Sequence, residues 1–349
     1  MLAVPKVRFR DAQIEMAHGA GGKASRRLVE GLFVPLLGEA SGEPSAGPLG
    51  DAAHVRMNGT RLAITTDSFV VKPLRFPGGS IGELAVNGTV NDLAVSGARA
   101  ETLVVTYILE AGLPTEVLEQ EVRAMAAAAR RAGVVIAGGD TKVVEHGKAD
   151  RMYIGSCGIG RFIEGVEVSP QSVRPGDRII LSGPIGDHGI TILLARGELD
   201  FEAEICSDTR PVLPLVEAMA AVAAPGIRWM RDPTRGGVAT SLNELALDCG
   251  LGICLAEEQI PIHDSVRGAC ELLGLEPMHI ANEGQFLAVV APEFADAALA
   301  ALRAAPGGQA AAMIGEVRAQ PAGTVLVSTL YGGTRVIDML VGDPLPRIC

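Results

Sequence analysis

The first half of the chain alternates between segments with helical and with strand periodicity. Apolar residues at roughly helical spacing, such as Ile81, Leu84 and Leu93, predict a helix over 80–97 that Gly97 closes. Short runs rich in β-branched residues between such segments indicate strands. The other elements predicted in this half are a helix over 114–132 and strands over 62–71, 103–109, 134–137 and 151–161, the third strand ending at Gly138-Gly139-Asp140.

The second half begins near residues 173–177, a turn with Pro and Gly that precedes a strand over 178–183. Alternating strands and helices predict a mixed α and β fold, with a boundary between two halves near 165–175. Residues 38–53 are rich in Gly, Pro, Ser and Ala and predict a surface loop. The helices predicted in the second half cover 187–197, 211–224, 236–249, 265–274 and 293–304, and the strands cover 252–256, 285–291 and 311–318.

Composition narrows the class of protein. The 349 residues are 48% hydrophobic, which is enough for about two domains. The net charge is −11 and Lys and Arg form no basic block, so nucleic acid is not an expected partner. The six cysteines form no CxxC pair, which is typical of reduced thiols and predicts a cytoplasmic protein. The N-terminus has no signal-peptide pattern and no apolar run is long enough to span a bilayer, so no membrane contact is expected.

Four aspartates stand where apolar sequence gives way to polar residues: Asp67, Asp92, Asp140 and Asp232. A carboxylate embedded in apolar sequence is costly to bury unpaired, and a shared Mg²⁺ would stabilise several of them together. Each aspartate taken singly is more often a cap or turn residue. Their recurrence in one chain favours a metal site.

Two glycine-rich loops are candidates for binding phosphate. The first, 18–23, offers backbone N–H groups and a lysine, but it has no strand before it as a dinucleotide fold requires, and it lacks the P-loop residues. An ordinary flexible loop is its alternative interpretation. In the second, 234–237, Arg235 could clamp an anion at a helix start. The residues assigned to nucleotide binding are His18, Gly19, Gly21, Gly22, Lys23, Asn91, Thr141, Thr234, Arg235 and Gly236.

The chain ends in a thiol. Cys349 follows Pro344 and Pro346, which favour an extended tail with some reach. Arg347 favours the thiolate, while the terminal carboxylate opposes it. A terminal thiol can be carried from one active site to another. The alternative is an incidental thiol at a frayed end.

Three further polar residues are candidates for catalysis. Lys142 follows Asp140 closely, and a nearby acid would keep it protonated. Glu283 lies between a predicted helix and a predicted strand; its alternative is a solvated loop acid. His188 could assist proton transfer. The alternative, which is the more common case, is a hydrogen-bonded structural histidine at the start of a helix. The chain contains no HExxH motif and no pattern of a Ser/His/Asp triad.

Eight sequence motifs cover nearly the whole chain in order. They are HGAGGK at 18–23, TTDSFVVKPLRFPGGSIGELAVNGTVNDLAVSGA at 65–98, AGGDTKVV at 137–144, SGPIGDHG at 182–189, RDPTRGGVATSLNELA at 231–246, CELLGLEP at 270–277, ANEGQF at 281–286 and LPRIC at 345–349. In these motifs the chain resembles the HypE family of hydrogenase maturation proteins. The long block at 65–98 and the terminal motif are highly specific together. One position departs from the family pattern, because Asn87 stands where a small residue or cysteine is expected.

The resemblance implies the two-domain α+β fold of the PurM-like ATP-binding superfamily. The expected N-terminal domain covers 1–165, and its sheet pairs with that of a second subunit into a barrel with ATP sites at the interface. An α/β-layered domain is expected over 166–330. A flexible tail that carries the acceptor cysteine is expected over 331–349.

The resemblance also implies a reaction. A partner, HypF, would load a carbamoyl group onto Cys349, and ATP with Mg²⁺ would drive its dehydration to a thiocyanate. The cyanide would pass to iron on a HypC–HypD complex for nickel–iron hydrogenase. In this chemistry the four aspartates would hold Mg²⁺, Glu283 would take the N–H proton, and Lys142 would orient or protonate the reacting group.

Two other functions stay open at this point. A selenophosphate synthetase belongs to the same superfamily, but it usually carries its reactive Cys or selenocysteine near the N-terminal glycine loop. No cysteine precedes Cys157 here. The second alternative is a nucleotide-binding scaffold that presents its tail without chemistry of its own.

Overall fold

The structure, a computed structural model, describes residues 8–41, 50–197, 203–342 and 345–349, and has an α+β fold with two large sheets. The first sheet has the spatial order β1 (Ala53–Met57), β2 (Thr60–Phe69), β7 (Met152–Phe162), β5 (Ala98–Glu110) and β6 (Val135–Val144). The second has the order β14 (Thr334–Ile337), β13 (Val325–Ser328), β10 (Gly252–Ala256), β12 (Ala312–Arg318), β8 (Arg178–Leu181), β11 (Leu287–Val290) and β9 (Ile227–Arg231).

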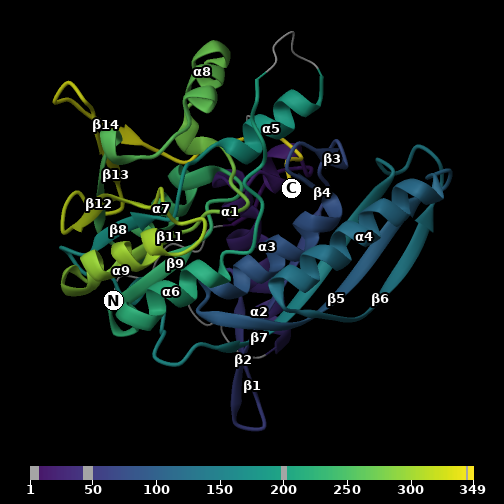
Figure 1. Ribbon diagram of the computed structural model, residues 1–349, viewed down its shortest axis with the longest axis horizontal. Helices are drawn as coiled ribbons and strands as arrows, with labels where there is room; N and C mark the ends of the chain where they lie inside the picture. Colours follow the sequence, from purple (N-terminus) through teal and green to yellow (C-terminus); the bar gives the residue numbers. More distant parts are fainter. Residues whose placement is uncertain (1–7, 42–49, 198–202, 343–344) are drawn as a thin grey trace.

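Within the described part of the chain, helices cover one face of the first sheet and leave the other uncovered. α3 (Ile81–Val95) and α4 (Thr115–Ala132) lie on the covered face (Figure 1). Side chains alternate along β5, so Leu103 and Val105 are buried against the helices while Val104 and Ile108 are 44% and 42% exposed. The face that α3 and α4 leave uncovered also exposes Ile159, and we refer to it as the open face.

The second sheet is covered on both faces. α7 (Gly237–Cys249) packs against Ile179 and Val289, whereas α6 (Leu213–Ala223) and α9 (Pro292–Ala304) pack together against Ile180 and Ala288. Neighbouring strand residues point to opposite faces, so continuous apolar runs in β8 and β11 serve both helix layers. The remaining α-helices are α1 (Lys23–Leu28), α2 (Val34–Ser41), α5 (Asp187–Ala195) and α8 (Asp264–Leu273).

The elements predicted from periodicity are largely confirmed, and three differences matter for function. The strand predicted to end at Gly138-Gly139-Asp140 instead continues to Val144, because it pairs in parallel with β5 along its length. Residues 334–337, which we assigned to the tail, form β14 on the edge of the second sheet. The predicted surface loop 38–53 is wrong at both ends, because α2 continues to Ser41 and β1 begins at Ala53, while its residues 42–49 lie outside the described part of the chain.

The end of the chain lies near the middle of the molecule. The C-terminus is close to α5 and to the small hairpin of β3 (Arg75–Phe76) and β4 (Gly79–Ser80) (Figure 1). Among the described residues, none of the helices combines the length and the apolar character that a membrane span requires.

Candidate functional site

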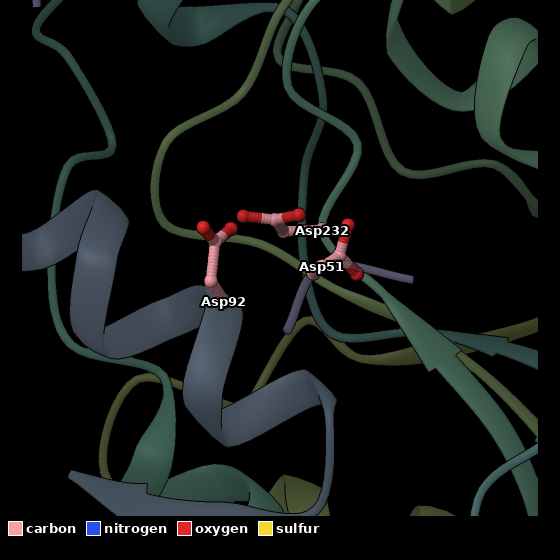
Figure 2. Close-up of side chains that lie close together, drawn as sticks. All are labelled: Asp51, Asp92 and Asp232. Carbon is pink, nitrogen blue, oxygen red and sulfur yellow. The ribbon is translucent and has the colours of Figure 1, made fainter. Parts of the chain in front are cut away.

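Three carboxylates from distant parts of the sequence converge beside the first sheet. Asp51 precedes β1, Asp92 lies on α3, and Asp232 follows β9 directly. One oxygen from each lies within 4.8 Å of the others (Figure 2). We call these three residues the acidic cluster. Carboxylate oxygens at such spacing are the ligand set that Mg²⁺ prefers.

Burial and mutual repulsion set the charge of the acidic cluster. Burial raises the pKa of Asp232 to about 8, and the charge of Asp51 adds to this effect. Burial, Asp232 and Asp51 together raise the pKa of Asp92 well above its usual value. Thr65 opposes this shift because its hydroxyl donates to Asp92 at 2.9 Å. A divalent cation would relieve the repulsion, so these residues fit Mg²⁺.

A fourth aspartate stands close to the acidic cluster. Asp67, on β2, is buried enough to raise its own pKa, and its charge also raises the pKa of Asp92 and Asp232. The guanidinium of Arg235 acts in the opposite direction on Asp67. Three of the four aspartates predicted from the sequence are therefore brought together, namely Asp67, Asp92 and Asp232.

The two glycine loops pack against each other next to these acids. Arg235 donates to the backbone carbonyl of Gly19 at 2.8 Å. Gly21 has φ +78°, and a Cβ there would lie 2.7 Å from the Cβ of Arg235, so only glycine fits this approach. The structure thus joins the loop 18–23 to the loop 234–237, as phosphate binding by both would require.

Several residues of these loops already have partners in the fold. Lys23 forms an ion pair with Asp338 at 2.5 Å. His18 is buried; its Nε2 lies 2.8 Å from Asp11, and its Nδ1 accepts the backbone N–H of Glu15 at 2.9 Å. Both side chains hold the N-terminal segment in place. To contact phosphate, Lys23 would have to leave Asp338.

Glu283 is buried beside the loop 234–237. Burial, with the charges of Asp232 and Asp67, raises the pKa of Glu283 well above its usual value, and Arg235 partly offsets this. Asp208 fixes the backbone here, because its two oxygens accept the N–H groups of Glu283 at 3.0 Å and of the next residue at 3.1 Å. The Oε1 atom of Glu283 is buried without a hydrogen-bond partner among the described residues. A carboxylate with such a raised pKa is a strong base when ionised.

The last residues of the chain pair with the end of β2. The backbone N–H of Val70 donates to an oxygen of the terminal carboxylate of Cys349 at 2.9 Å, and that of Lys72 donates to the carbonyl of Arg347 at 3.4 Å. The tail therefore lies antiparallel to residues 70–72, which follow β2. Ile348 and Cys349 are buried, being 2% and 9% exposed.

An ion pair and a small cavity mark where the tail reaches the surface. Arg347 pairs with Asp150, and its Nε donates to the carbonyl of Val70 at 3.3 Å. Arg196, which follows α5 directly, donates to the carbonyl of Arg347 at 3.1 Å. A cavity of about 250 Å³ beside Pro346 is lined by these cations. The tail is thus held by backbone hydrogen bonds, by the charged anchor Arg347, and by the side chains of Leu345 and Ile348, which are part of the hydrophobic core.

Comparison with known proteins identifies the family. The model of the C-terminal domain of AIR synthase related proteins matches residues 174–328, and that of the N-terminal domain matches residues 49–162. Carbamoyl dehydratase HypE of Azotobacter vinelandii is 48% identical over 341 residues, which cover 98% of each chain. The chain belongs to the HypE family of AIR synthase related proteins. HypE of Escherichia coli K12 is 43% identical, over 96% of this chain and 99% of its own.

Solved HypE structures share the fold. A HypE in complex with ATP is 44% identical and superposes with a TM-score of 0.79 over 97% of this chain and 100% of its own. The HypE of a HypE–HypF complex is 43% identical, with a TM-score of 0.82 over 88% of this chain and 99% of its own. A thiamine-monophosphate kinase complex at 20% identity and a TM-score of 0.64 shares the fold alone. The two-domain α+β architecture expected from the sequence is confirmed.

One predicted metal ligand lies apart from the others within the chain. Across the first sheet, Asp140 on β6 pairs with Thr106 on β5, which pairs with Gly155 on β7. Gly155 in turn pairs with Ser68 on β2. Asp140 is therefore three strand spacings, about 14 Å, away from β2. Asp67 pairs with Ser156 and is the neighbour of Ser68 along β2. Because successive side chains of a strand point to opposite faces, Asp67 and Asp140 lie on opposite faces of the sheet. Asp140 is exposed on the open face because its strand continues past it.

Two other predicted residues lie close to Asp140. Lys142 contacts the carboxylate of Asp140 at 2.5 Å, and both side chains are mostly exposed. The backbone N–H of Thr141 donates to Asp140 at 2.8 Å, and these contacts hold the pKa of Asp140 below its usual value. Within one chain these three residues therefore do not reach the acidic cluster.

Asn91, which we assigned to the nucleotide, has a structural role in this HypE chain. Its amide donates to the backbone carbonyls of Arg210 and Glu283 at 2.9 and 3.1 Å. Its carbonyl oxygen accepts the N–H of Val212 at 2.8 Å. The side chain therefore ties α3 to the second half of the chain. In the other loop, Thr234 accepts the N–H of Gly237 at 2.9 Å through its backbone, which closes the turn around Gly236.

Two residues of the HypE site were missed by sequence reasoning. Asp51 was placed in a surface loop because Gly, Pro and Ala surround it. It lies two residues before β1, but β1 is mostly exposed, so no apolar pattern marked Asp51. Asp208 lies in a segment without clear periodicity, and no sequence signal pointed to it.

Proposed function

We propose that this protein is a carbamoyl dehydratase that uses ATP to convert a carbamoylated Cys349 into a thiocyanate for hydrogenase maturation. The observation that carries the proposal is the docking of Cys349 beside the end of β2, the strand that also bears Asp67. A HypE-family chain with a docked terminal thiol, an acidic cluster and two glycine loops has the parts that this reaction needs.

The chemistry removes one water from a thiocarboxamide. An amide oxygen leaves poorly, so it first attacks the γ-phosphorus of ATP, and ADP departs. Loss of the resulting phosphate, together with the N–H protons, forms the carbon–nitrogen triple bond on sulfur. The products are a thiocyanate, ADP and inorganic phosphate, and the oxygen of the lost water ends in phosphate.

The acidic cluster would hold the cation for the triphosphate. Asp51, Asp92 and Asp232 are the proposed ligands, and Asp67 stands beside them. Mg²⁺, when bound there, would neutralise phosphate charge in the transition state. The backbone N–H groups of the loop 18–23 and the guanidinium of Arg235 would bind the remaining phosphate oxygens.

Glu283 is the proposed base for the N–H proton. Its raised pKa makes its carboxylate more basic than an exposed one, and the charge of Arg235 partly opposes the rise of that pKa. Asp208 would hold it in place through the backbone. The docked tail would exclude water, which protects the activated carboxamide from hydrolysis.

We also propose that the site is completed across a homodimer. Val104, Ile108 and Ile159 leave an apolar open face that a second copy would cover, as the barrel of this family implies. Asp140 and Lys142 lie on the same face. In the dimer they would serve the nucleotide held by the partner subunit, with Lys142 orienting or protonating the reacting group.

HypF is the proposed source of the carbamoyl group, in line with the solved HypE–HypF complex, and a HypC–HypD complex is the proposed acceptor of cyanide. Loading by a partner requires the tail to leave its docked position beside β2, so a flexible tail is part of the proposal. The six cysteines are not in disulfides, which accords with a cytoplasmic location.

Intact-protein mass spectrometry tests the function directly. The protein is incubated with HypF, carbamoyl phosphate and Mg-ATP, and its mass is followed over time. A carbamoyl adduct on Cys349 that then loses one water supports the proposal. An adduct that never loses water would leave the tail as a carrier only, and no adduct at all would contradict the assignment of Cys349 as acceptor.

A further inference from the structure

One imidazole touches the docked tail. The Nε2 of His188 lies 2.7 Å from the carbonyl oxygen of Ile348, the residue before the reactive cysteine. The histidine is the second residue of α5 and is completely buried. A carbonyl oxygen can only accept, so the imidazole must donate from Nε2.

The other ring nitrogen is held by a serine. The Nδ1 of His188 lies 2.8 Å from the hydroxyl of Ser207, and that hydroxyl oxygen accepts the backbone N–H of Thr209 at 3.2 Å. Burial lowers the pKa of His188, so the ring is neutral and Nδ1 accepts the Ser207 proton. The ring also stands edge-on to Phe76, with centroids 5.6 Å apart. Its tautomer and its orientation are therefore both fixed.

The same short segment also holds the proposed base. Ser207 directly precedes Asp208, whose two carboxylate oxygens accept the backbone N–H groups of Glu283 and Gly284. Residues 207–209 thus contact the tail through His188 on one side and the backbone of Glu283 on the other. A fixed distance between tail and base follows from this arrangement.

We infer that His188, fixed by Ser207, is a positioning residue that sets the carbamoylated Cys349 in register with Glu283. The inference rests on the proposed dehydration of the tail. His188 takes no proton in this scheme; it holds the backbone one residue before the reacting sulfur. Misplacement of about 1 Å is enough to slow an oriented reaction strongly, so one such bond can govern the rate.

Alkylation of Cys349 tests the positioning without any catalysis. The full-length protein is treated with iodoacetamide, and modification is followed by mass spectrometry of the C-terminal peptide. We expect His188→Ala to increase the alkylation rate of Cys349 roughly tenfold, because the docked tail loses one buried hydrogen bond. Ser207→Ala should act in the same direction and keeps the ring, so it serves if His188→Ala fails to fold.

Two variants serve as controls. His188→Gln keeps an N–H donor near the position of Nε2 and should restore a rate close to that of the wild type. His146→Ala removes an exposed histidine from the β6–β7 connection and should change nothing. Wild-type rates in both His188→Ala and Ser207→Ala would overturn the inference. A His188→Gln rate equal to that of His188→Ala would assign the effect to packing and would overturn it as well.

A single-turnover measurement then separates this inference from the proposed function. Protein preloaded with the carbamoyl group is mixed with Mg-ATP, and the loss of water is timed. His188→Ala should slow the conversion about tenfold with the KM for ATP unchanged. If wild-type protein never loses water, the proposed function fails, while the alkylation ratios still decide whether His188 positions the tail.

Discussion

The backbone N–H of Val70 donates to the terminal carboxylate of Cys349 at 2.9 Å, which places the end of the chain beside the end of β2. Asp67 lies three residues before Val70, roughly 10 Å along an extended chain. One antiparallel pairing of backbone groups therefore places the end of the chain next to the strand that carries Asp67. The docking is not covalent and is therefore reversible; it consists of hydrogen bonds, one partly exposed ion pair and the buried side chains of Leu345 and Ile348.

The first prediction concerns the thiol. Cys349→Ala should abolish both the carbamoyl and the cyano adduct, and it should leave the melting temperature and ATP binding close to those of the wild type. The reason is that the tail is held by backbone hydrogen bonds and by the buried side chains of Leu345 and Ile348, which this variant keeps. Intact-protein mass spectrometry and thermal melting measure both effects.

Cys206→Ala is the matched control, because Cys206 is an exposed free thiol in the same molecule. It should form the product at the wild-type rate. Hydrogenase maturation by Cys349→Ala in cells would disprove the terminal-thiol mechanism.

The second prediction concerns Asp92 and has opposite signs for binding and for stability. Asp92→Asn should weaken Mg-ATP binding at least tenfold, because one ligand of the acidic cluster is lost. The same change should raise the melting temperature of the metal-free protein by about 2 °C, because the buried Asp92 must either stay charged beside Asp232 and Asp51 or take up a proton on folding, and Asn does neither. Calorimetric titration with Mg-ATP and thermal melting in EDTA measure the two quantities.

Asp296→Asn, an exposed aspartate on α9, is the control and should change neither value. Unchanged affinity for Mg-ATP in Asp92→Asn would remove this residue from the proposed metal site. A lowered melting temperature in EDTA would show that repulsion within the acidic cluster is not what the variant relieves.

The comparison between sequence and structure differs from element to element. The helix over 80–97 was predictable, because its apolar residues repeat at helical spacing and α3 is buried on nearly all sides. The position of Asp140 was not, because a Gly-Gly pair suggested the end of a strand that pairing with β5 in fact extends. Asp51 was missed because composition alone cannot tell a solvated loop from one that folds back onto α3. Tertiary pairing decides such cases, and a single sequence does not contain it.

The third prediction concerns pH. Burial raises the pKa of Asp232 to about 8 and that of Asp92 well above its usual value, so the metal-free folded protein binds protons that the unfolded chain releases above pH 4. The contribution of the acidic cluster to stability therefore falls as pH rises from about 4 to about 8. Mg²⁺ binds the ionised carboxylates and competes with these protons.

The increase in melting temperature on adding Mg²⁺ should thus be larger at pH 8.5 than at pH 6. Melting curves with and without Mg²⁺ at the two pH values measure it. Asp232→Asn should reduce the difference between the two pH values. A Mg²⁺ effect that is equal at both values, or larger at pH 6, would contradict the assignment.

The fourth prediction concerns the open face. Val104→Glu should convert a dimer into monomers, because it buries an unpaired charge in the proposed interface. Val222→Glu, at an equally exposed valine on α6, is the control and should stay dimeric. Light scattering coupled to size exclusion measures the mass. A wild-type protein that is monomeric at micromolar concentration would contradict the dimer.

The dimer also makes a prediction about mixed subunits. Asp92→Asn and Asp140→Asn should each be inactive alone. If Asp140 serves the partner subunit, a mixed dimer has one of its two sites with both aspartates intact. Because random exchange makes about half of the dimers mixed, about a quarter of the wild-type activity should return. If Asp140 served its own chain, each subunit of the mixture would carry one lesion and no activity would return. Dehydration measured after the two variants are co-refolded therefore decides between a site within one chain and a site shared by two.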